Sequence, residues 1–493
     1  MPSRRSRVRS LDLWTKELQD DIRGLQSGPE SRYAKLNDCS KGSLPSKRSN
    51  AIYEPLKQKD SIRLLFLEPS AEADDPIECT IIHARLGDHP SYQALSYEWG
   101  PQDAEHDPSI TINGKHRLRV RKNLFEGLKE IRRTLKESKQ ALWVDAICID
   151  QEKSHGEKPH QVKLMGDIFS QAELVITWLG VSSGQSDMAM DTLNVFSQYK
   201  PLFHESASPF FDAWYSYLSH VGRDPILALC NRSYWRRVWI VQEIQLARSI
   251  VIRCGSKAIT DVDFQKALDF FESSYSIGNK EKWQGSRSLR DFGVSIAESL
   301  PFKHLHARKM PRRSLGEWIR ICSDGRLAST EPRDYIYALL GISVLEDETG
   351  ETPLVSKGLP TYCYPTIDYD TPLDILYRQA LHVLRYGATT EAWLSAPSGC
   401  AVAQYLAEGM GLPFDYEDHV RTFQHDDINI RANIDSSWTA CVGFTRNVLP
   451  INRVVEDLII NEDEVAHRRQ RCQERIREWN ERQAERRRAT EKK

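Results

Sequence analysis

The chain has 493 residues, of which 40% are apolar and 28% charged, and a formal net charge of −2 at pH 7. This length is too great for one hydrophobic core and predicts two domains with tails. The composition is typical of a soluble globular protein and excludes a largely disordered chain. The near-zero net charge argues against a globally basic nucleic-acid-binding protein. No apolar run approaches the roughly 18 residues of a membrane span.

Ten cysteines are scattered singly along the chain, without a C-x-x-C pair or zinc-finger spacing. This pattern predicts reduced thiols and no metal site. The N-terminus has no apolar segment of a secretory signal. We therefore expect a cytoplasmic protein, and the arginines between Arg4 and Arg9 leave nuclear import open as an alternative.

Residues 1–58 are rich in serine, arginine and lysine and predict a disordered basic tail. Apolar runs at 62–67 and 77–86 then predict two strands. Asn113-Gly114 predicts a type I′ hairpin turn between two further short strands. A helix is expected to follow over 123–135, with Asn123 as its N-cap.

Strands and helices are expected to alternate in the next part of the chain. We predict buried strands at 142–149, 174–180 and 250–254, and helices at 160–172 and 234–247. Such alternation predicts parallel βαβ crossovers and therefore an α/β fold with a doubly wound, mainly parallel sheet. The strands before it are β-rich N-terminal additions.

The domain boundaries follow from the change of pattern near residue 258. The α/β domain is expected over 59–258, a mostly helical second domain over 259–450, and a charged helical tail over 451–493.

Four segments resemble the signature blocks of the heterokaryon incompatibility (HET) family of filamentous fungi, and their order and spacing also match. They are Tyr92–Gly100, Leu142–Gln151, Gln161–Gly180 and Tyr234–Glu243. A weaker resemblance, to the segment that often follows the domain, covers Glu331–Gly341 and Ile367–Tyr369. The resemblance implies a signalling protein of non-self recognition and programmed cell death.

HET domains are similar in fold to TIR domains, some of which hydrolyse NAD with a helix glutamate. This analogy implies Glu243 as the catalytic candidate, with Arg236 and Trp239 on the same face of the 234–247 helix as ligand-binding candidates. A carboxylate there would stabilise the oxocarbenium-like state of nicotinamide release. NAD would then be the substrate, and no cofactor is required.

The alternative is that this helix only packs, with its tryptophans in the core and its charges paired. The domain would then be a non-catalytic, self-associating module that acts through partner proteins.

Other ligand-binding candidates lie at predicted strand ends, where ligands of open α/β sheets bind. They are Asp145 in the 142–149 strand, Asp150 and Gln151 at the exit of that strand, and Trp99 and Gly100 after the first strand of the domain. The alternatives are structural: a hydrogen-bonded or capping carboxylate and a tryptophan that plugs the sheet edge. Glycine-rich phosphate loops, G-x-S-x-G and H-E-x-x-H are absent from the sequence, and neither nucleic acid nor membrane is an expected partner.

Overall fold

The computed structural model describes residues 52–70, 72, 74–135, 140–152, 156–198, 223–277, 287–308, 313–343, 365–386 and 397–414. The tail predicted at 451–493 and almost all of that at 1–58 lie outside these residues. The chain divides into two compact units, Met1–Pro311 and Arg312–Lys493. Each unit is described by itself below.

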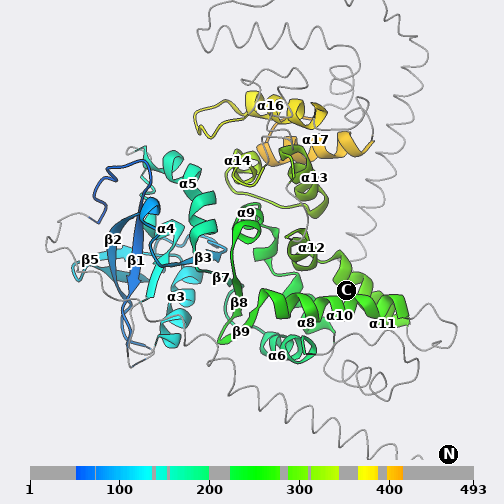
Figure 1. Ribbon diagram of the computed structural model, residues 1–493, viewed down its shortest axis with the longest axis horizontal. Coiled ribbons are helices and arrows are strands. Elements are labelled where there is room, and N and C mark those ends of the chain that lie inside the picture. The colour runs from blue at the N-terminus through cyan, green and yellow to red at the C-terminus, as the bar shows by residue number, and fades with distance from the viewer. Residues whose placement is uncertain are drawn as a thin grey trace, which may run out of the picture. The chain divides into compact units, whose positions relative to one another are not determined.

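The described part of the first unit contains a sheet of nine strands in the order β5-β4-β2-β1-β6-β3-β7-β8-β9 (Figure 1). The strands are β1 (Ser61–Leu67), β2 (Glu78–Arg85), β3 (Gln93–Tyr97), β4 (Ser109–Ile112), β5 (His116–Arg119), β6 (Gln140–Trp143), β7 (Leu174–Trp178), β8 (Ile250–Cys254) and β9 (Lys257–Thr260).

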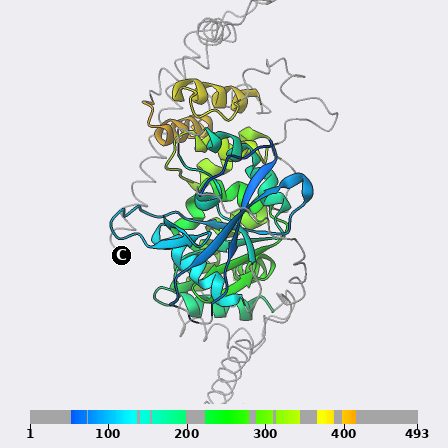
Figure 2. The ribbon, with the colours of Figure 1, turned by 90° about the vertical axis from the view of Figure 1, so that its left-hand side faces the viewer.

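Four neighbouring strands, β6, β3, β7 and β8, run parallel to one another. Around this parallel core the sheet is mixed, because β1 pairs antiparallel with both β2 and β6, and β9 pairs antiparallel with β8. The predicted α/β class with a parallel core is confirmed. The N-terminal strands, blue in Figure 2, face the viewer in that view, and green helices lie behind them.

Helices cover both faces of the parallel core. On one face Trp178 of β7 packs against α3 (Lys122–Thr134), where a Cβ at Gly127 would lie 3.3 Å from the indole. On the other face Trp143 of β6 packs against Phe169 of α5 (Glu157–Gln171), with ring centroids 5.6 Å apart. Trp143 and Val175 are both in register with Ala94, and Trp178 is three residues beyond Val175, so the two tryptophans point to opposite faces. The core is therefore doubly wound.

The remaining described helices of the first unit follow β2, β6 or β7 or come after the last strand of the sheet. They are the short 3-10 segments η2 (Leu86–Asp88) and η4 (Ser233–Arg236), and the α-helices α4 (Asp145–Cys148), α6 (Ser186–Phe196), α8 (Asp224–Cys230), α9 (Trp239–Leu246), α10 (Asp261–Ile277), α11 (Arg287–Glu298) and α12 (Leu300–Ala307). Helices α10, α11 and α12 belong to the first unit, although the sequence placed the start of the second domain at residue 259.

Three local predictions can be compared with the structure. The hairpin is confirmed, because Asn113 and Gly114 have φ of 55° and 67° between β4 and β5. The strand predicted over 142–149 is wrong beyond Trp143, since the apolar run continues as α4. A buried helical turn and a buried strand are equally apolar, so periodicity does not separate them. Asn123 is not the N-cap of α3, because its side chain donates to the carbonyl of Glu98 at 2.6 Å and accepts from the Trp178 indole at 3.0 Å.

In the second unit, the described helices are α13 (Leu315–Gly325), α14 (Asp334–Leu340), α16 (Leu373–Tyr386) and α17 (Pro397–Met410). The two segments of the weaker resemblance contact each other here. The Tyr369 hydroxyl donates to Asp334 Oδ1 at 2.8 Å, and the Tyr337 hydroxyl donates to the carbonyl of Asp368 at 2.5 Å. These bonds tie α14 to the chain before α16.

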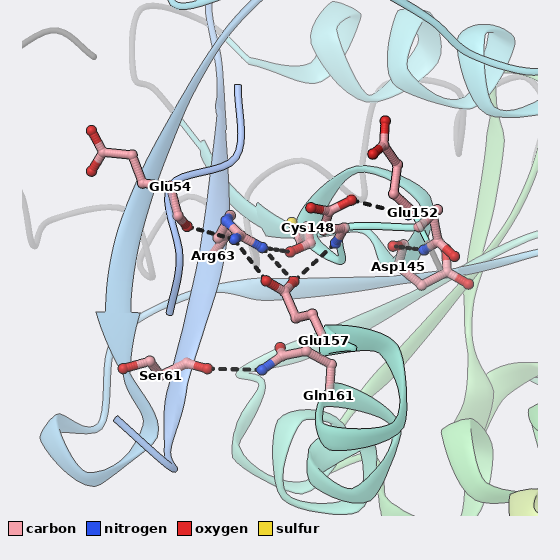
Figure 3. A network of polar contacts seen from close by, with 10 residues as sticks. Glu54, Ser61, Arg63, Asp145, Cys148, Glu152, Glu157 and Gln161 are labelled. Carbon is pink, nitrogen blue, oxygen red and sulfur yellow. Dashed lines mark hydrogen bonds and ion pairs between the residues drawn. The ribbon is translucent and has the colours of Figure 1, made fainter. Parts of the chain in front are cut away.

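Strand β1 is tied to the parallel core by the fully buried guanidinium of Arg63 (Figure 3). Arg63 donates to both carboxylate oxygens of Glu157 in α5, at 2.6 and 2.9 Å. It also donates to the carbonyls of Cys148 and Glu54, at 3.1 and 2.7 Å. The bidentate geometry and the two carbonyl bonds offset the cost of burying the charge.

We predict that Arg63→Ala destabilises the first unit by about 3–5 kcal/mol, because Glu157 is left as a buried carboxylate without its cation. Arg85→Ala is the matched control on the neighbouring strand, since Arg85 forms an exposed pair with Asp60 and such pairs contribute little. Urea unfolding followed by tryptophan fluorescence measures both. Equal midpoints for the two variants would contradict the prediction.

Candidate functional site

The carboxyl ends of β3 and β7 mark the point where the winding of the parallel core reverses. Of the four parallel strands, β3 comes first in the chain and lies between β6 and β7, and the crossover helices α3 and α5 pack on opposite faces of the sheet. Ligands of doubly wound sheets bind outside the strand ends at this position. Trp99 and Gly100 directly follow β3, and Asp145 follows β6, so three predicted residues lie at this edge.

A buried network of polar side chains surrounds Glu243, which is 2% exposed on α9. Ser96 of β3 donates its hydroxyl to Glu243 Oε2. The Tyr234 hydroxyl lies 2.6 Å from Ser96 Oγ and 3.2 Å from Thr177 Oγ1 of β7. Ser96 and Thr177 are in register and share one sheet face, so α9 places Glu243 over the two strands that flank the reversal.

Arg237 is the cationic partner of Glu243. Its Nη1 lies 3.3 Å from Oε2 and its Nη2 lies 3.5 Å from Oε1. The predicted helix over 234–247 is wrong, because η4 ends at Arg236, Arg237 is extended with φ −72° and ψ 133°, and α9 begins at Trp239. This break turns Arg237 toward Glu243 and leaves Arg236 exposed. Arg236 therefore does not share a helix face with Glu243.

Asp145 is the second carboxylate near Arg237. It is half-buried, and its Oδ2 accepts from the Trp99 indole at 2.8 Å while Oδ1 accepts from the amide of Ala146 at 2.7 Å. Burial raises the pKa of Asp145, and the attraction of Arg237 and the Trp99 hydrogen bond partly counter that rise. Tyr97 also bonds to Asp145, and burial raises the pKa of this tyrosine.

Burial and the attraction of Arg237 also act in opposite directions on the pKa of Glu243. Burial raises the pKa of its carboxyl, and Arg237 and the Ser96 hydroxyl oppose the rise without cancelling it. The pKa of Arg237 is itself raised, since the attraction of Glu243 and Asp145 outweighs desolvation of the guanidinium. One guanidinium thus serves two carboxylates at the carboxyl edge of the sheet.

The other predicted residues lie apart from this network or at its margin. Asp150 is buried beside the Arg63 ion pair, where its amide donates to Glu157 Oε1 at 2.9 Å and its Oδ1 accepts from the amide of Glu152 at 3.0 Å. Gln151 is exposed and donates to the carbonyl of Asp145 at 3.0 Å. Trp239 is half-buried, one helical turn before Glu243.

Gly100 has a positive φ of 72°, which suits the turn after β3. Arg121 donates to the Gly100 carbonyl, and its guanidinium lies 5.0 Å from the centroid of the Trp99 ring. One face of Trp99, a predicted ligand-binding residue, thus forms a cation–π contact with Arg121.

Four residues of the network were not predicted as site residues: Ser96, Thr177, Tyr234 and Arg237. Ser96 and Thr177 have one signal in the sequence, because each is a polar residue within an otherwise apolar strand. The structure pairs these two residues across β3 and β7. No sequence signal distinguishes Arg237 from Arg236, since the choice depends on a helix break.

Within the described ranges, no group of three or more His, Cys, Asp and Glu side chains could hold a metal ion. Among the helices of those ranges, none combines the length and apolar character needed to cross a membrane.

We predict that Arg237→Ala lowers the free energy of unfolding by about 3 kcal/mol at pH 7, because it leaves Glu243 buried without a cation. Without Arg237 the pKa of Glu243 rises further, so the folded variant retains a proton that the unfolded chain releases above the ordinary value of 4.5. Because the pKa of Glu243 is already raised in the folded wild type, the loss of stability relative to the wild type should grow as pH rises above that folded-state pKa and shrink as pH falls below it.

Arg236→Ala is the matched control, since the neighbouring guanidinium is exposed. Urea unfolding of both variants at several pH values tests the assignment. A loss in Arg237→Ala that does not depend on pH would argue against the shared guanidinium.

Comparison with known proteins agrees with the position of this network. Residues 92–243 match the family model described as Heterokaryon incompatibility protein (HET). The chain is similar to "Heterokaryon incompatibility protein 6, OR allele" of Neurospora crassa, with 28% identity over 268 residues that cover 48% of this chain and 39% of the relative. The chain thus spans well under half of the length of that curated relative, and no solved structure matches it. Residues 92–243 therefore carry a HET domain, which is similar to that of heterokaryon incompatibility proteins of filamentous fungi.

Proposed function

We propose that this chain is a heterokaryon-incompatibility protein, whose HET domain triggers programmed cell death when non-self is recognised. The supporting observation is that the segment matched by the family model contains the whole buried network around Glu243. The family match begins at Tyr92, just before β3, and ends at Glu243, so it contains the central parallel strands β3, β6 and β7 and every member of the Glu243 network. The name of the Neurospora crassa relative supports the same role.

For the mechanism, the geometry favours the non-catalytic module that acts through protein partners or self-association. The Glu243 side chain is 3% exposed, paired with Arg237 and bonded by Ser96. To reach a ligand it would have to leave both partners, and an unpaired buried guanidinium is costly. In this arrangement the carboxylate supports the packing of α9 on the sheet.

NAD hydrolysis through Glu243 is the second candidate. Its support is the position of Glu243 beside the strand ends where ligands bind, together with the TIR-like fold that we propose from the doubly wound core. The raised pKa of Glu243 works against it, because stabilising an oxocarbenium-like state requires the ionised carboxylate. We propose the cytoplasm as the site of action in both cases, without a cofactor.

We predict that induced expression of the full chain in a fungal cell arrests growth, and that Glu243→Gln does so to a similar extent. Glutamine keeps the volume and an acceptor for the Ser96 hydroxyl, and Asp145 remains as a carboxylate that attracts Arg237, so the domain should remain folded. Colony growth and vital staining measure the response, and Arg236→Ala is the control at an exposed position of the same segment. Normal growth on strong expression of the wild-type chain would refute the proposed role.

The purified wild-type chain should release no more nicotinamide from NAD than Glu243→Gln does. Chromatography of the reaction mixture measures the product, and circular dichroism checks that both proteins are folded. The catalytic mechanism would replace the module mechanism if the wild type released nicotinamide and Glu243→Gln did not, and if Glu243→Gln also failed to arrest growth.

A further inference from the structure

The connection between β7 and α6 is a short exposed loop at the carboxyl edge of the parallel core. Residues 181–185 are exposed, and Val181 is 48% exposed. Gly180 and Gly184 have positive φ of 103° and 55°. The loop therefore presents two serines, Ser182 and Ser183, to solvent.

Arg232, from the segment between α8 and η4, forms hydrogen bonds with this loop. Its Nη1 donates to the carbonyls of Leu179 and Val181, at 2.8 and 3.0 Å. A Cβ at Gly180 would lie 3.1 Å from that nitrogen, so glycine lets the guanidinium approach the backbone. The second nitrogen, Nη2, donates to Ser183 Oγ at 2.8 Å. The guanidinium is thus fixed by the backbone and directed at one serine hydroxyl.

Six other serine hydroxyls in the described ranges face carboxylates. These pairs are Ser70 with Asp75, Ser96 with Glu243, Ser182 with Asp187, Ser233 with Glu98, Ser314 with Glu317, and Ser329 with Asp334. A phosphate on any of these oxygens would be repelled by the acid beside it. The hydroxyl of Ser183 contacts the guanidinium of Arg232, whereas that of its neighbour Ser182 contacts the carboxylate of Asp187.

We propose that Ser183 is a phosphorylation site and that Arg232 binds the phosphoserine, which fastens the β7–α6 loop to the end of the sheet. A serine kinase supplies the group from ATP. The bond from the γ-phosphorus to the β–γ bridging oxygen breaks, a bond from Ser183 Oγ to phosphorus forms, ADP leaves, and the hydroxyl proton passes to a base of the kinase.

The modified side chain has a charge near −2 and three acceptor oxygens, which suit the guanidinium better than a neutral hydroxyl does. The phosphate also lies just before the N-terminus of α6, where the helix dipole favours negative charge. This inference does not depend on the proposed role in cell death.

Two experiments on the full chain test it. Mass spectrometry of the protein recovered from fungal cells, both growing and arrested, should locate phosphate on Ser183 and lose it in Ser183→Ala but not in Ser182→Ala. In the second experiment, phosphoserine is installed at 183 during translation, and hydrogen exchange of the 181–185 amides should slow several-fold.

Phosphoserine at 182 is the matched control and should not slow exchange, because Asp187 faces it. Arg232→Gln should remove the effect of phosphate at 183 while the rest of the chain keeps its exchange rates. Absence of phosphate on Ser183 in cells would overturn the proposal. Equal exchange with and without the phosphate, or an effect that survives Arg232→Gln, would also overturn it.

Discussion

The arrangement of the HET domain depends on the attraction between one guanidinium and two carboxylates at the carboxyl edge of its sheet. Arg237 lies in the extended break between η4 and α9, pairs with Glu243, and attracts Asp145 across the edge. The three residues come from the break before α9, from α9 itself and from the first position of α4, just after β6. Their attraction joins the last helix of the family segment to strands that precede it by about a hundred residues.

Such a cluster is costly to build, because desolvation of charged groups opposes folding and only good pairing offsets it. The hydroxyls of Ser96, Tyr234 and Tyr97 reduce that cost by bonding to the same carboxylates or to one another. The result is a centre whose groups satisfy each other and leave little for a ligand. This is the physical reason for favouring a signalling module over an enzyme.

The sequence predicted much of the fold, because the parallel strands are marked by apolar runs and the hairpin by Asn-Gly. It predicted Trp99, Asp145 and Glu243, which the structure places around one edge. It failed at η4 and α9, where one continuous helix was predicted over 234–247, because the backbone extends at Arg237. It also failed at α4, where an apolar run has the same composition in either conformation, and at Asn123, whose side chain serves a distant strand instead of its own helix.

The position of β1 limits which segments of the gene can be exchanged by recombination. Strand β1 lies upstream of the family segment but is inserted between β2 and β6, and β8 lies downstream of the segment but pairs with β7. A recombination that exchanged only residues 92–243 between two genes would place foreign side chains against β1 on one side and β8 on the other. The segment that the family model matches is therefore smaller than the sheet whose side chains have to pack together.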